Sequence, residues 1–242
     1  MIQVPLLAHS ILKESSPGAI ITPDWHLIAT NGFSDTLDLI QSNNTPLELR
    51  APMVYWRGSS TGVLEGPRRR HCFGLKRIQV CNASKEVHWV DAKISRLTQW
   101  CNKGHHLERH GLMASLGSDV DWLKYRGIFE IDGNVNAWGH FWRLRSGSLV
   151  FKIESDYTSF LDQKEIPGVH YISIQKNLSN LAEVTAKITD DANLPFFQRV
   201  ISNAKELTAY MTLENEIFRV AHELSSVWRI NVSFRNERSK LS

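Results

Sequence analysis

The stretch from Asp119 to Lys152 limits the possible folds more than any other part of this sequence. It contains a short apolar strand (127–131), a turn, an aromatic-rich amphipathic segment (137–144), a Ser-Gly break and a second apolar strand (149–153). Strand, turn, helix and strand in this order predict a βαβ unit, in which the strands are parallel and the helix covers one sheet face. Ligands of such units bind in the crevice beyond the carboxyl ends of the strands. We therefore predict an α/β fold with a binding crevice at this sheet edge.

The turn after the first strand has the sequence Asp132-Gly133-Asn134. Gly133 and Asn134 are predicted to bring backbone N–H groups to the N-terminus of the helix, an arrangement that suits a phosphate. Asp-Gly-Asn is also common in ordinary turns. The spacing alone supports both interpretations.

A second candidate loop follows the apolar, β-rich segment 52–56. The strand predicted there runs into Arg57-Gly58-Ser59-Ser60-Thr61-Gly62, which offers backbone N–H groups, hydroxyls and one guanidinium. This chemistry suits a diphosphate, and a flexible solvent loop explains the composition equally well. The basic run 68–70 beyond it is interpreted as a solvated turn or as a patch for nucleic acid.

The flanking segments predict further elements. Residues 18–25 (GAIITPDW) are typical of a buried strand that ends at a Pro-Asp turn, and Trp25 and His26 after it are assigned to the core rather than to a substrate site. Helical spacing or strand-like composition predicts a helix at 33–41, a helix and a strand within 73–100, a strand at 167–174 followed by a helix, and two helices at 196–210 and 214–228.

Length and composition bound the class of protein. The 242 residues suffice for one large domain or two small ones, and a hydrophobic fraction of 42% excludes a disordered chain. A formal charge of +3 is compatible with an anionic ligand but falls far short of a histone-like excess. The cysteines are odd in number and lack metal-ligand spacing, so we predict a reducing compartment without a disulfide framework. They are Cys72, Cys81 and Cys101.

The N-terminal segment predicts a cytoplasmic protein. Its apolar run is too short to span a bilayer, and it lacks the pattern of a secretory signal. Cys101, His105, His106 and His110 invite a metal interpretation, but their spacing matches no usual zinc site. We therefore expect no bound metal.

Several motifs in one order resemble a known family. VYWRGSSTG at 54–62, KYRGIFEIDGNVNAWGHFWRL from Lys124, SGSLVFK, and PGVHYISI with NLSNL are similar to family 90 glycosyltransferases, the group that holds lipopolysaccharide-core and capsule transferases and protein O-glucosyltransferases. The similarity implies an α/β, GT-B-like architecture with three parts. Residues 1–50 correspond to an incomplete N-terminal acceptor-side lobe, 51–190 to a Rossmann-like nucleotide-sugar-binding lobe, and 191–242 to helices that pack back across the lobes.

The resemblance also implies a site. In the family a serine, here Ser59, and an arginine a few residues on contact the nucleotide sugar; Arg70 keeps the register best, with Arg68 and Arg69 as alternates. Where protein O-glucosyltransferases align an arginine that grips phosphate, this chain has Gly139, and either Arg143 or Arg145 is the candidate replacement unless both face solvent. The implied nucleotide-sugar-binding set is Arg57, Ser59, Arg70, Asn134, Val135, Asn136, Ala137, Trp138 and Gly139.

The activity that the resemblance implies is a metal-independent, inverting transfer. The expected donor is a UDP-hexose or UDP-pentose, and the expected acceptor is a hydroxyl of a surface glycan, a lipopolysaccharide or a protein, with peripheral association at a membrane that carries the acceptor. The family's catalytic base is an aspartate whose position falls before Met1, and neither Asp24 nor Asp35 matches it. An inactive, truncated nucleotide-sugar-binding domain is therefore the alternative. A nucleic-acid-binding module is disfavoured, because the tryptophans fall on apolar faces.

Overall fold

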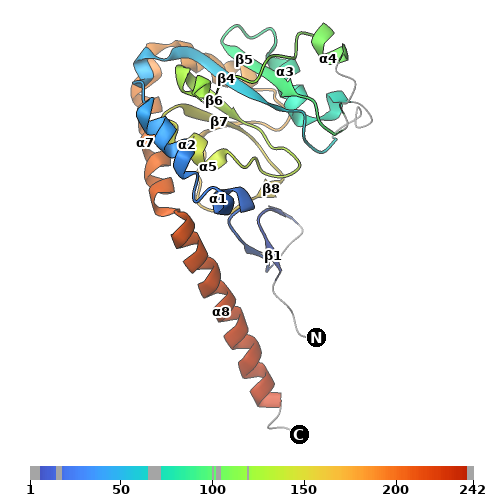
Figure 1. The fold of residues 1–242 in the computed structure, drawn as a ribbon, viewed down its shortest axis with the longest axis vertical. Coiled ribbons are helices and arrows are strands. Elements are labelled where there is room, and N and C mark those ends of the chain that lie inside the picture. Colours follow the sequence, from blue (N-terminus) through green and yellow to red (C-terminus); the bar gives the residue numbers. More distant parts are fainter. Residues whose placement is uncertain are drawn as a thin grey trace.

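The centre of the molecule is a parallel sheet of five strands in the order β5-β4-β6-β7-β9 (Figure 1). The computed structural model describes residues 6–14, 18–64, 72–99, 101, 105–118 and 120–238, without the side chains of 105–106 and 228–238. The strands are β4 (Ala51–Ser59), β5 (Val90–Arg96), β6 (Tyr125–Glu130), β7 (Leu149–Ile153) and β9 (Ile172–Ile174). When these five strands are numbered by their order along the chain, their order across the sheet is 2-1-3-4-5, which is a doubly wound topology.

Near-continuous apolar runs explain why β6 and β7 form the middle of the sheet. All residues of β7 and all but the first of β6 are buried, as expected for parallel strands that are covered on both faces. Gly127 is needed for close packing here, because a Cβ at this position would lie 2.8 Å from the Phe151 ring and 3.0 Å from Val54. The strands can therefore approach with full-sized side chains on both neighbours.

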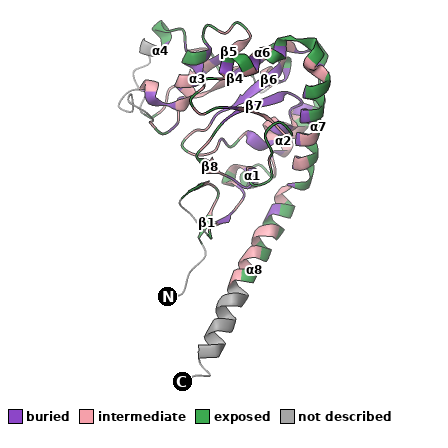
Figure 2. Ribbon diagram, turned by 180° about the vertical axis from the view of Figure 1, so that it is seen from behind, coloured by how far each residue is buried: buried purple, intermediate pink, exposed green. Residues whose placement is uncertain are grey.

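Helices cover both faces of the sheet (Figures 1 and 2). The helices α3 (Lys76–Ser84) and α6 (Leu181–Ala186) pack together on one face, and α5 (His140–Arg145) and α7 (Leu194–Tyr210) pack together on the other. The predicted βαβ unit is confirmed: it consists of β6, α5 and β7. The strands β6 and β7 pair in parallel, with Gly127 opposite Leu149. The predicted pair of a helix and a strand within 73–100 is confirmed by α3 and β5.

The N-terminal part forms two small sheets beside the main one. Strand β1 (Leu7–Ala8) pairs in parallel with β3 (Ile20–Ile21), and β2 (Ile11–Leu12) pairs antiparallel with β8 (Tyr157–Thr158). The strand predicted at 18–25 is limited to two residues, because Asp24 accepts a hydrogen bond from the backbone N of Leu27 and caps α1 (Trp25–Ala29). Helix α2 (Ser34–Ser42) follows.

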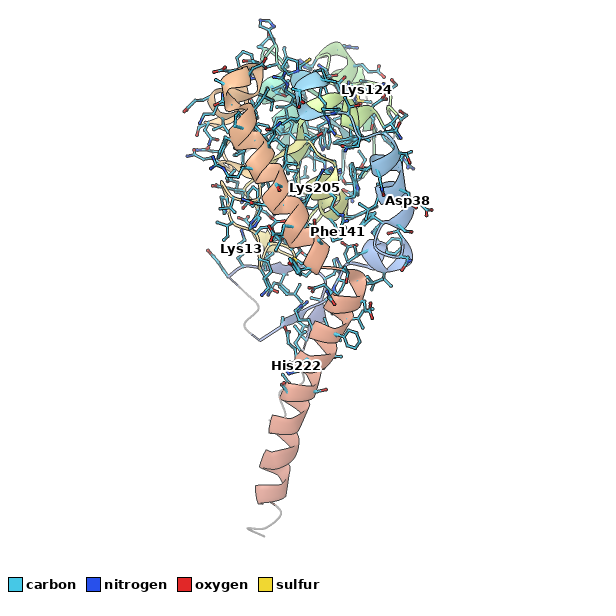
Figure 3. The ribbon with its side chains drawn as sticks, turned by 90° about the vertical axis from the view of Figure 1, so that its left-hand side faces the viewer. Lys13, Asp38, Lys124, Phe141, Lys205 and His222 are labelled. Carbon is cyan, nitrogen blue, oxygen red and sulfur yellow. A yellow bond between two sulfur atoms is a disulfide. The ribbon has the colours of Figure 1, made fainter. Side chains whose placement is uncertain are left out.

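The remaining helices complete the description. Helix α8 (Leu213–Arg238) begins against β3, where Arg219 donates a hydrogen bond of 2.5 Å to the carbonyl oxygen of Ile21, and then extends beyond the body of the molecule past His222 (Figure 3). It therefore does not return across the sheet, whereas α7 does. The short elements are α4 (His105–Arg109) and 3-10 turns at 47–49, 72–74, 121–124, 187–189 and 191–193. Within the described ranges, none of the helices is long and apolar enough to cross a bilayer.

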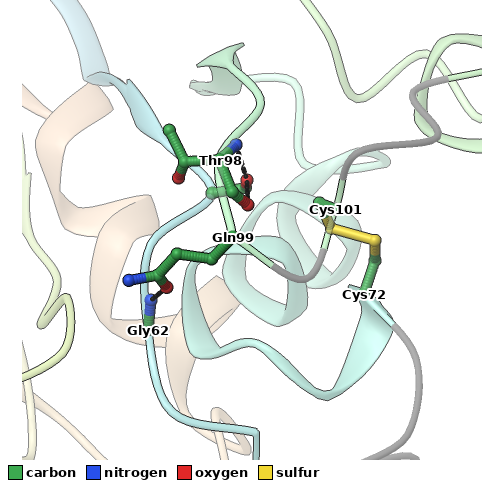
Figure 4. Close-up of a disulfide and its surroundings, with 6 residues drawn as sticks. Gly62, Cys72, Thr98, Gln99 and Cys101 are labelled. Carbon is green, nitrogen blue, oxygen red and sulfur yellow. Dashed lines mark hydrogen bonds between the residues drawn. A yellow bond between two sulfur atoms is a disulfide. The ribbon is translucent and has the colours of Figure 1, made fainter.

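The prediction of a chain without disulfides was wrong. Cys72, just before α3, and Cys101, after β5, are joined across 29 residues of sequence (Figure 4). Burial raises the pKa of the remaining thiol, Cys81, to about 12. Disulfides persist mainly in oxidising compartments. The odd cysteine count therefore did not indicate a reducing one, since two of the three cysteines meet in space.

Candidate functional site

The candidate site lies where β4 and β6, the first and third strands of the sheet in chain order, are neighbours. Strand order reverses at this point, and the crevice beyond the carboxyl ends of such strands is where ligands bind in doubly wound folds. Ser59 ends β4 and is followed by the loop to Gly62, while β6 is followed by Asp132 and Gly133. The two loops chosen from the sequence therefore meet at one edge.

Arg77 of α3 joins these two loops. Its guanidinium donates to the hydroxyl of Thr61 at 2.6 Å, to the carbonyl of Ser59 at 3.2 Å, and to the carbonyls of Ile131 and Asp132 at 3.2 and 2.9 Å. Burial lowers the pKa of Arg77 to about 10, so the group stays protonated at neutral pH. These acceptors are all neutral, and the side chain is only partly buried. A positive charge therefore lies between the loop after β4 and the loop after β6.

Gln99 makes a second bridge between the loops. Its side-chain carbonyl oxygen accepts from the backbone N of Gly62 at 3.2 Å (Figure 4). Its amide nitrogen donates to the side chain of Asn134 at 2.9 Å. Gln99 has a φ of 54°, a left-handed conformation that is uncommon for a residue with a side chain. The disulfide at Cys101 anchors this segment to the start of α3, which also carries Arg77.

Gly133 is required by the close approach of the loops. A Cβ at this position would lie 3.1 Å from the Thr61 hydroxyl and 3.2 Å from the Arg77 guanidinium. A larger residue would push both groups out of place. The glycine of the Asp-Gly-Asn turn thus serves packing as well as backbone access.

A pocket with about 400 Å³ of empty space, part of it open to solvent, lies beside these loops. Its walls combine cationic, acidic and hydroxyl groups, which suits a polar ligand that carries both charge and hydroxyls. The lining residues are Val63, Lys76, Asp132, Gly133, Ile153, Glu154, Ser155, Asp156, Tyr157 and Lys176. In the described part of the chain, no three histidine, cysteine or acidic side chains gather as metal ligands would.

Asp132 is the carboxylate of the pocket with the most perturbed pKa. Burial raises its pKa to about 6, although Ser155 donates a hydrogen bond to it. Because the folded pKa lies above the unfolded value, ionisation of Asp132 costs stability, and this cost grows as pH rises from about 4 to about 6.

We expect Asp132→Asn to stabilise the fold at pH 7 by about 1–3 kcal/mol, since it removes the buried charge and keeps an oxygen that accepts from Ser155. Urea unfolding at several pH values measures the effect. The gain should vanish below about pH 4, where the wild-type carboxyl is protonated in both states. Equal stability of the two proteins at every pH would contradict the assignment.

A buried network of charges lies behind the turn that enters α5. Glu130 accepts from Arg143 at 2.7 Å, His140 contacts Glu165 at 2.6 Å, and Lys152 contacts Glu165 at 2.7 Å. Burial by itself would lower the pKa of His140, but Glu165 and Glu130 outweigh it and raise that pKa to about 9. Burial likewise opposes ionisation of Glu130, yet Arg143 and His140 lower its pKa to about 2. The network is thus fully ionised at neutral pH.

The network holds the turn through Asp162. This carboxylate accepts from Lys152 at 2.5 Å and from the side chain of Asn136 at 3.1 Å. The side-chain amide oxygen of Asn136 in turn accepts from the hydroxyl of Ser10 at 2.5 Å. Val135 accepts from the backbone N of Gly133 at 2.9 Å. The loop from Gly133 to Asn136 is therefore fixed from both sides.

The other residues of the predicted turn have different surroundings. Ala137 is buried, Trp138 is 58% exposed, and Gly139 precedes α5. Because α5 begins only at His140, Gly133 and Asn134 do not lie at a helix N-terminus, and that prediction was wrong.

Most of the arginines chosen from the sequence interact with protein groups outside the candidate site. Arg57 forms an ion pair with Asp91 at 2.7 Å inside the sheet, so we remove it from the candidate site. Arg143 belongs to the buried network, and Arg145 donates to the carbonyl of Thr208 on α7. A Cβ at Gly139 would lie 2.9 Å from the Arg143 guanidinium, which explains why no larger residue fits there. Residues 68–70, and Arg70 with them, lie outside the described residues.

Sequence reasoning missed Arg77 and Gln99 as site residues, and it selected the Asp132-Gly133-Asn134 turn for its backbone N–H groups rather than for the carboxylate of Asp132. Arg77 sits in an amphipathic helix and Gln99 in a linker, and neither carries a motif. Of the histidines once considered for a metal, His110 packs edge-on against Phe73. Cys101 is in the disulfide, and the side chains of His105 and His106 are not described.

The fold and the site together define a class of protein: a doubly wound α/β domain whose switch point is bordered by the hydroxyls of Ser59 and Thr61 and by the Arg77 guanidinium. The model of glycosyl transferase family 90 matches residues 2–195, and the chain belongs to this family. The resemblance seen in the ordered motifs is therefore confirmed.

Named relatives are similar over part of their length. Protein O-glucosyltransferase 3 of Rattus norvegicus is 32% identical over 159 residues, and protein O-glucosyltransferase 1 of Mus musculus is 29% identical over 157 residues. The alignments cover 65% and 64% of this chain but 28% and 37% of the relatives. The chain thus spans less than half the length of these curated relatives.

Solved structures show the shared fold. TarM superposes with a TM-score of 0.52 at 12% identity, over 90% of this chain and 49% of TarM. Anabaena HepE, crystallised in complex with UDP, has a TM-score of 0.48 at 15% identity, over 80% of this chain and 53% of HepE. The α/β, GT-B-like fold with a Rossmann-like sheet is confirmed.

Proposed function

We propose that this chain binds a UDP-sugar in the crevice between β4 and β6 and takes part in transfer of its hexose or pentose to an acceptor hydroxyl. The observation that carries the proposal is the Arg77 guanidinium, which keeps its charge between the loops after β4 and β6 with only neutral hydrogen-bond acceptors. Family membership supplies the class of reaction. Arg77 replaces Arg57 in the set chosen from the sequence.

The proposed reaction is an inverting transfer without a bound metal. The bond between C1 of the sugar and the diphosphate oxygen breaks, UDP leaves with the electron pair, and the acceptor oxygen bonds to C1. Fixed positive charge and backbone N–H groups stabilise the leaving diphosphate. Arg77, the hydroxyls of Ser59 and Thr61, and the loop at Gly133 are the groups in place for this task.

The acceptor proton needs a carboxylate base, and the candidates near the N-terminus are poor. Asp24 is engaged as the cap of α1. Asp35 is an exposed residue in the first turn of α2. We therefore propose no base within the described residues, and binding without turnover is the second candidate function.

The proposed acceptor is a surface glycan or a lipopolysaccharide-type saccharide, with a protein hydroxyl as the alternative. The location proposed with it is the cytoplasmic face of the membrane that carries the acceptor. The disulfide Cys72–Cys101 opposes a reducing compartment. Mass spectrometry of rapidly alkylated protein distinguishes a reducing from an oxidising compartment. Only free thiols gain the alkyl group, so Cys72 and Cys101 are alkylated in a reducing compartment and unmodified in an oxidising one.

Calorimetric titration of the full chain with UDP in the presence of EDTA tests the proposal. We expect saturable binding in the micromolar range that chelation does not weaken. A UDP-glucose hydrolysis assay run in parallel separates the two candidates, since binding without hydrolysis supports the non-transferring domain. A folded protein that binds neither UDP nor another nucleoside diphosphate would overturn the donor site.

A further inference from the structure

An exposed cluster of aromatic rings lies next to the turn of the candidate site. His26 is stacked on Trp138, with ring centroids 3.5 Å apart and planes at 21°, and contacts Trp25 at 3.8 Å. Trp25 is 63% exposed and Trp138 is 58% exposed. The assignment of Trp25 to the core was therefore wrong. Large aromatic side chains normally bury most of their area, so two exposed indoles in one place indicate a binding surface.

Three features make the cluster a surface for a small ring rather than for a protein. Two indoles exposed to this extent offer on the order of 300 Å², whereas a stable protein interface takes about 800 Å² from each partner. Ile28 of α1 is also 53% exposed and extends the apolar area by one side chain, and the residues after it, Ala29, Thr30 and Asn31, are exposed and mostly polar. Burial lowers the pKa of His26, so its ring is a neutral plate at pH 7.

The chemistry of an aromatic plate with polar surroundings matches that of a pyranose ring. The face of an aromatic ring is negative, and it attracts the slightly positive C–H groups on the apolar face of a sugar. The hydroxyls at the sugar's rim remain free to bond polar groups or water. A hexose with axial C–H groups on both faces presents the best complement.

The cluster is continuous with the candidate donor site through the chain. Trp138 follows Gly133 by five residues, a span of at most about 18 Å. The intervening Asn136 is fixed by Ser10 and Asp162. The same short loop therefore carries the crevice turn at one end and an exposed indole at the other, and α1 brings the second indole to it.

We propose that Trp25, His26 and Trp138 form a platform on which a sugar ring of a glycan acceptor stacks. As an acceptor site this inference rests on the proposed function, while glycan binding itself does not. His26 acts as a positioning residue that holds the two indoles in place. Occupants of other kinds, such as an unglycosylated peptide of small polar residues, lack a ring face that would stack on an exposed indole.

Nuclear magnetic resonance of the full chain labelled with ¹⁵N tests the platform. The indole N–H signals of Trp25 and Trp138 are assigned as those missing from Trp25→Ala and Trp138→Ala. Cellotetraose, maltotetraose and galactotetraose are then titrated without UDP. We expect cellotetraose to shift both signals saturably, and Trp138→Ala to weaken its binding at least tenfold.

Phe218→Ala is the matched control, because Phe218 is an aromatic residue of α8 with 66% exposure and lies outside the platform. It should bind cellotetraose as the wild type does. Failure of all three oligosaccharides to shift the two signals, undiminished binding by Trp138→Ala, or equal shifts with an unglycosylated Ser-rich peptide would each overturn the platform. Because UDP binding is measured separately, loss of the donor site and loss of the platform are distinguishable.

Discussion

Replacing Lys152 by methionine is expected to destabilise the protein by about 3–5 kcal/mol. The ammonium of Lys152 lies within 2.5 Å of Asp162 and 2.7 Å of Glu165, and only 8% of its side chain is exposed. Methionine fills a similar volume but leaves Asp162 without its cation and leaves Glu165 with His140 as its remaining cationic partner. Breaking a buried ion pair by removing one partner is costly for this reason. Urea unfolding followed by circular dichroism measures the loss.

Two further variants make this prediction specific. Lys124→Met removes an ion pair with Asp121 at the surface, where the lysine is exposed to solvent, and should leave the unfolding curve nearly unchanged (Figure 3). The double variant Lys152→Met, Glu165→Leu should be less destabilised than Lys152→Met alone, because it removes a carboxylate along with the cation. An equally small effect of Lys152→Met and Lys124→Met would show that the buried network does not stabilise the fold.

Replacing Arg77 by lysine is expected to weaken UDP binding at least tenfold. Lysine keeps the charge but lacks the planar fork that reaches Thr61, Ser59 and the two carbonyls after β6 at once. The loops then lose their common support, and the carbonyls that the fork satisfied cost about 1–3 kcal/mol each when left unpaired. Calorimetric titration with UDP measures the affinity, and thermal unfolding measures the stability.

Arg126→Lys is the matched control for Arg77→Lys. Arg126 is another arginine that donates to backbone carbonyls, those of Ile188 and Glu48, and it pairs with Asp191 at 2.6 Å. It lies at the opposite, amino-terminal end of β6, away from the crevice. We expect a comparable loss of stability with unchanged UDP affinity. If both variants lose UDP binding equally, the loss in Arg77→Lys results from lower stability of the whole fold. Arg77 would then have no specific role in binding UDP in the crevice.

Local sequence was sufficient for the elements of the sheet because the relevant signals are short in range. Apolar runs interrupted by a glycine-containing turn predicted β6, α5 and β7, and the Gly/Ser/Thr loop after β4 was placed at a strand end. The start of α5 was misplaced by three residues, since Ala137 has helical propensity but is buried in the turn before the helix. Boundaries depend on packing that periodicity does not encode.

The site was predictable only in part, because its geometry depends on contacts between distant segments. Ser59 and the Asp132-Gly133 turn could be chosen from composition and order. Arg77 could not, since its importance arises from hydrogen bonds to residues up to 55 positions away. Arg57, which looked equivalent in the sequence, is neutralised by Asp91 on the next strand.

The sequence by itself determined the family, the α/β class and the two loops that form the crevice, because these follow from the order of local patterns. The tertiary structure decided which charges are available. It pairs Arg143 and Lys152 with buried carboxylates, joins Cys72 to Cys101, and leaves the Arg77 charge without a carboxylate partner among the described residues. The physical reason is that the electrostatic state of a side chain depends on its neighbours in space, and parallel strands bring those neighbours from remote parts of the chain.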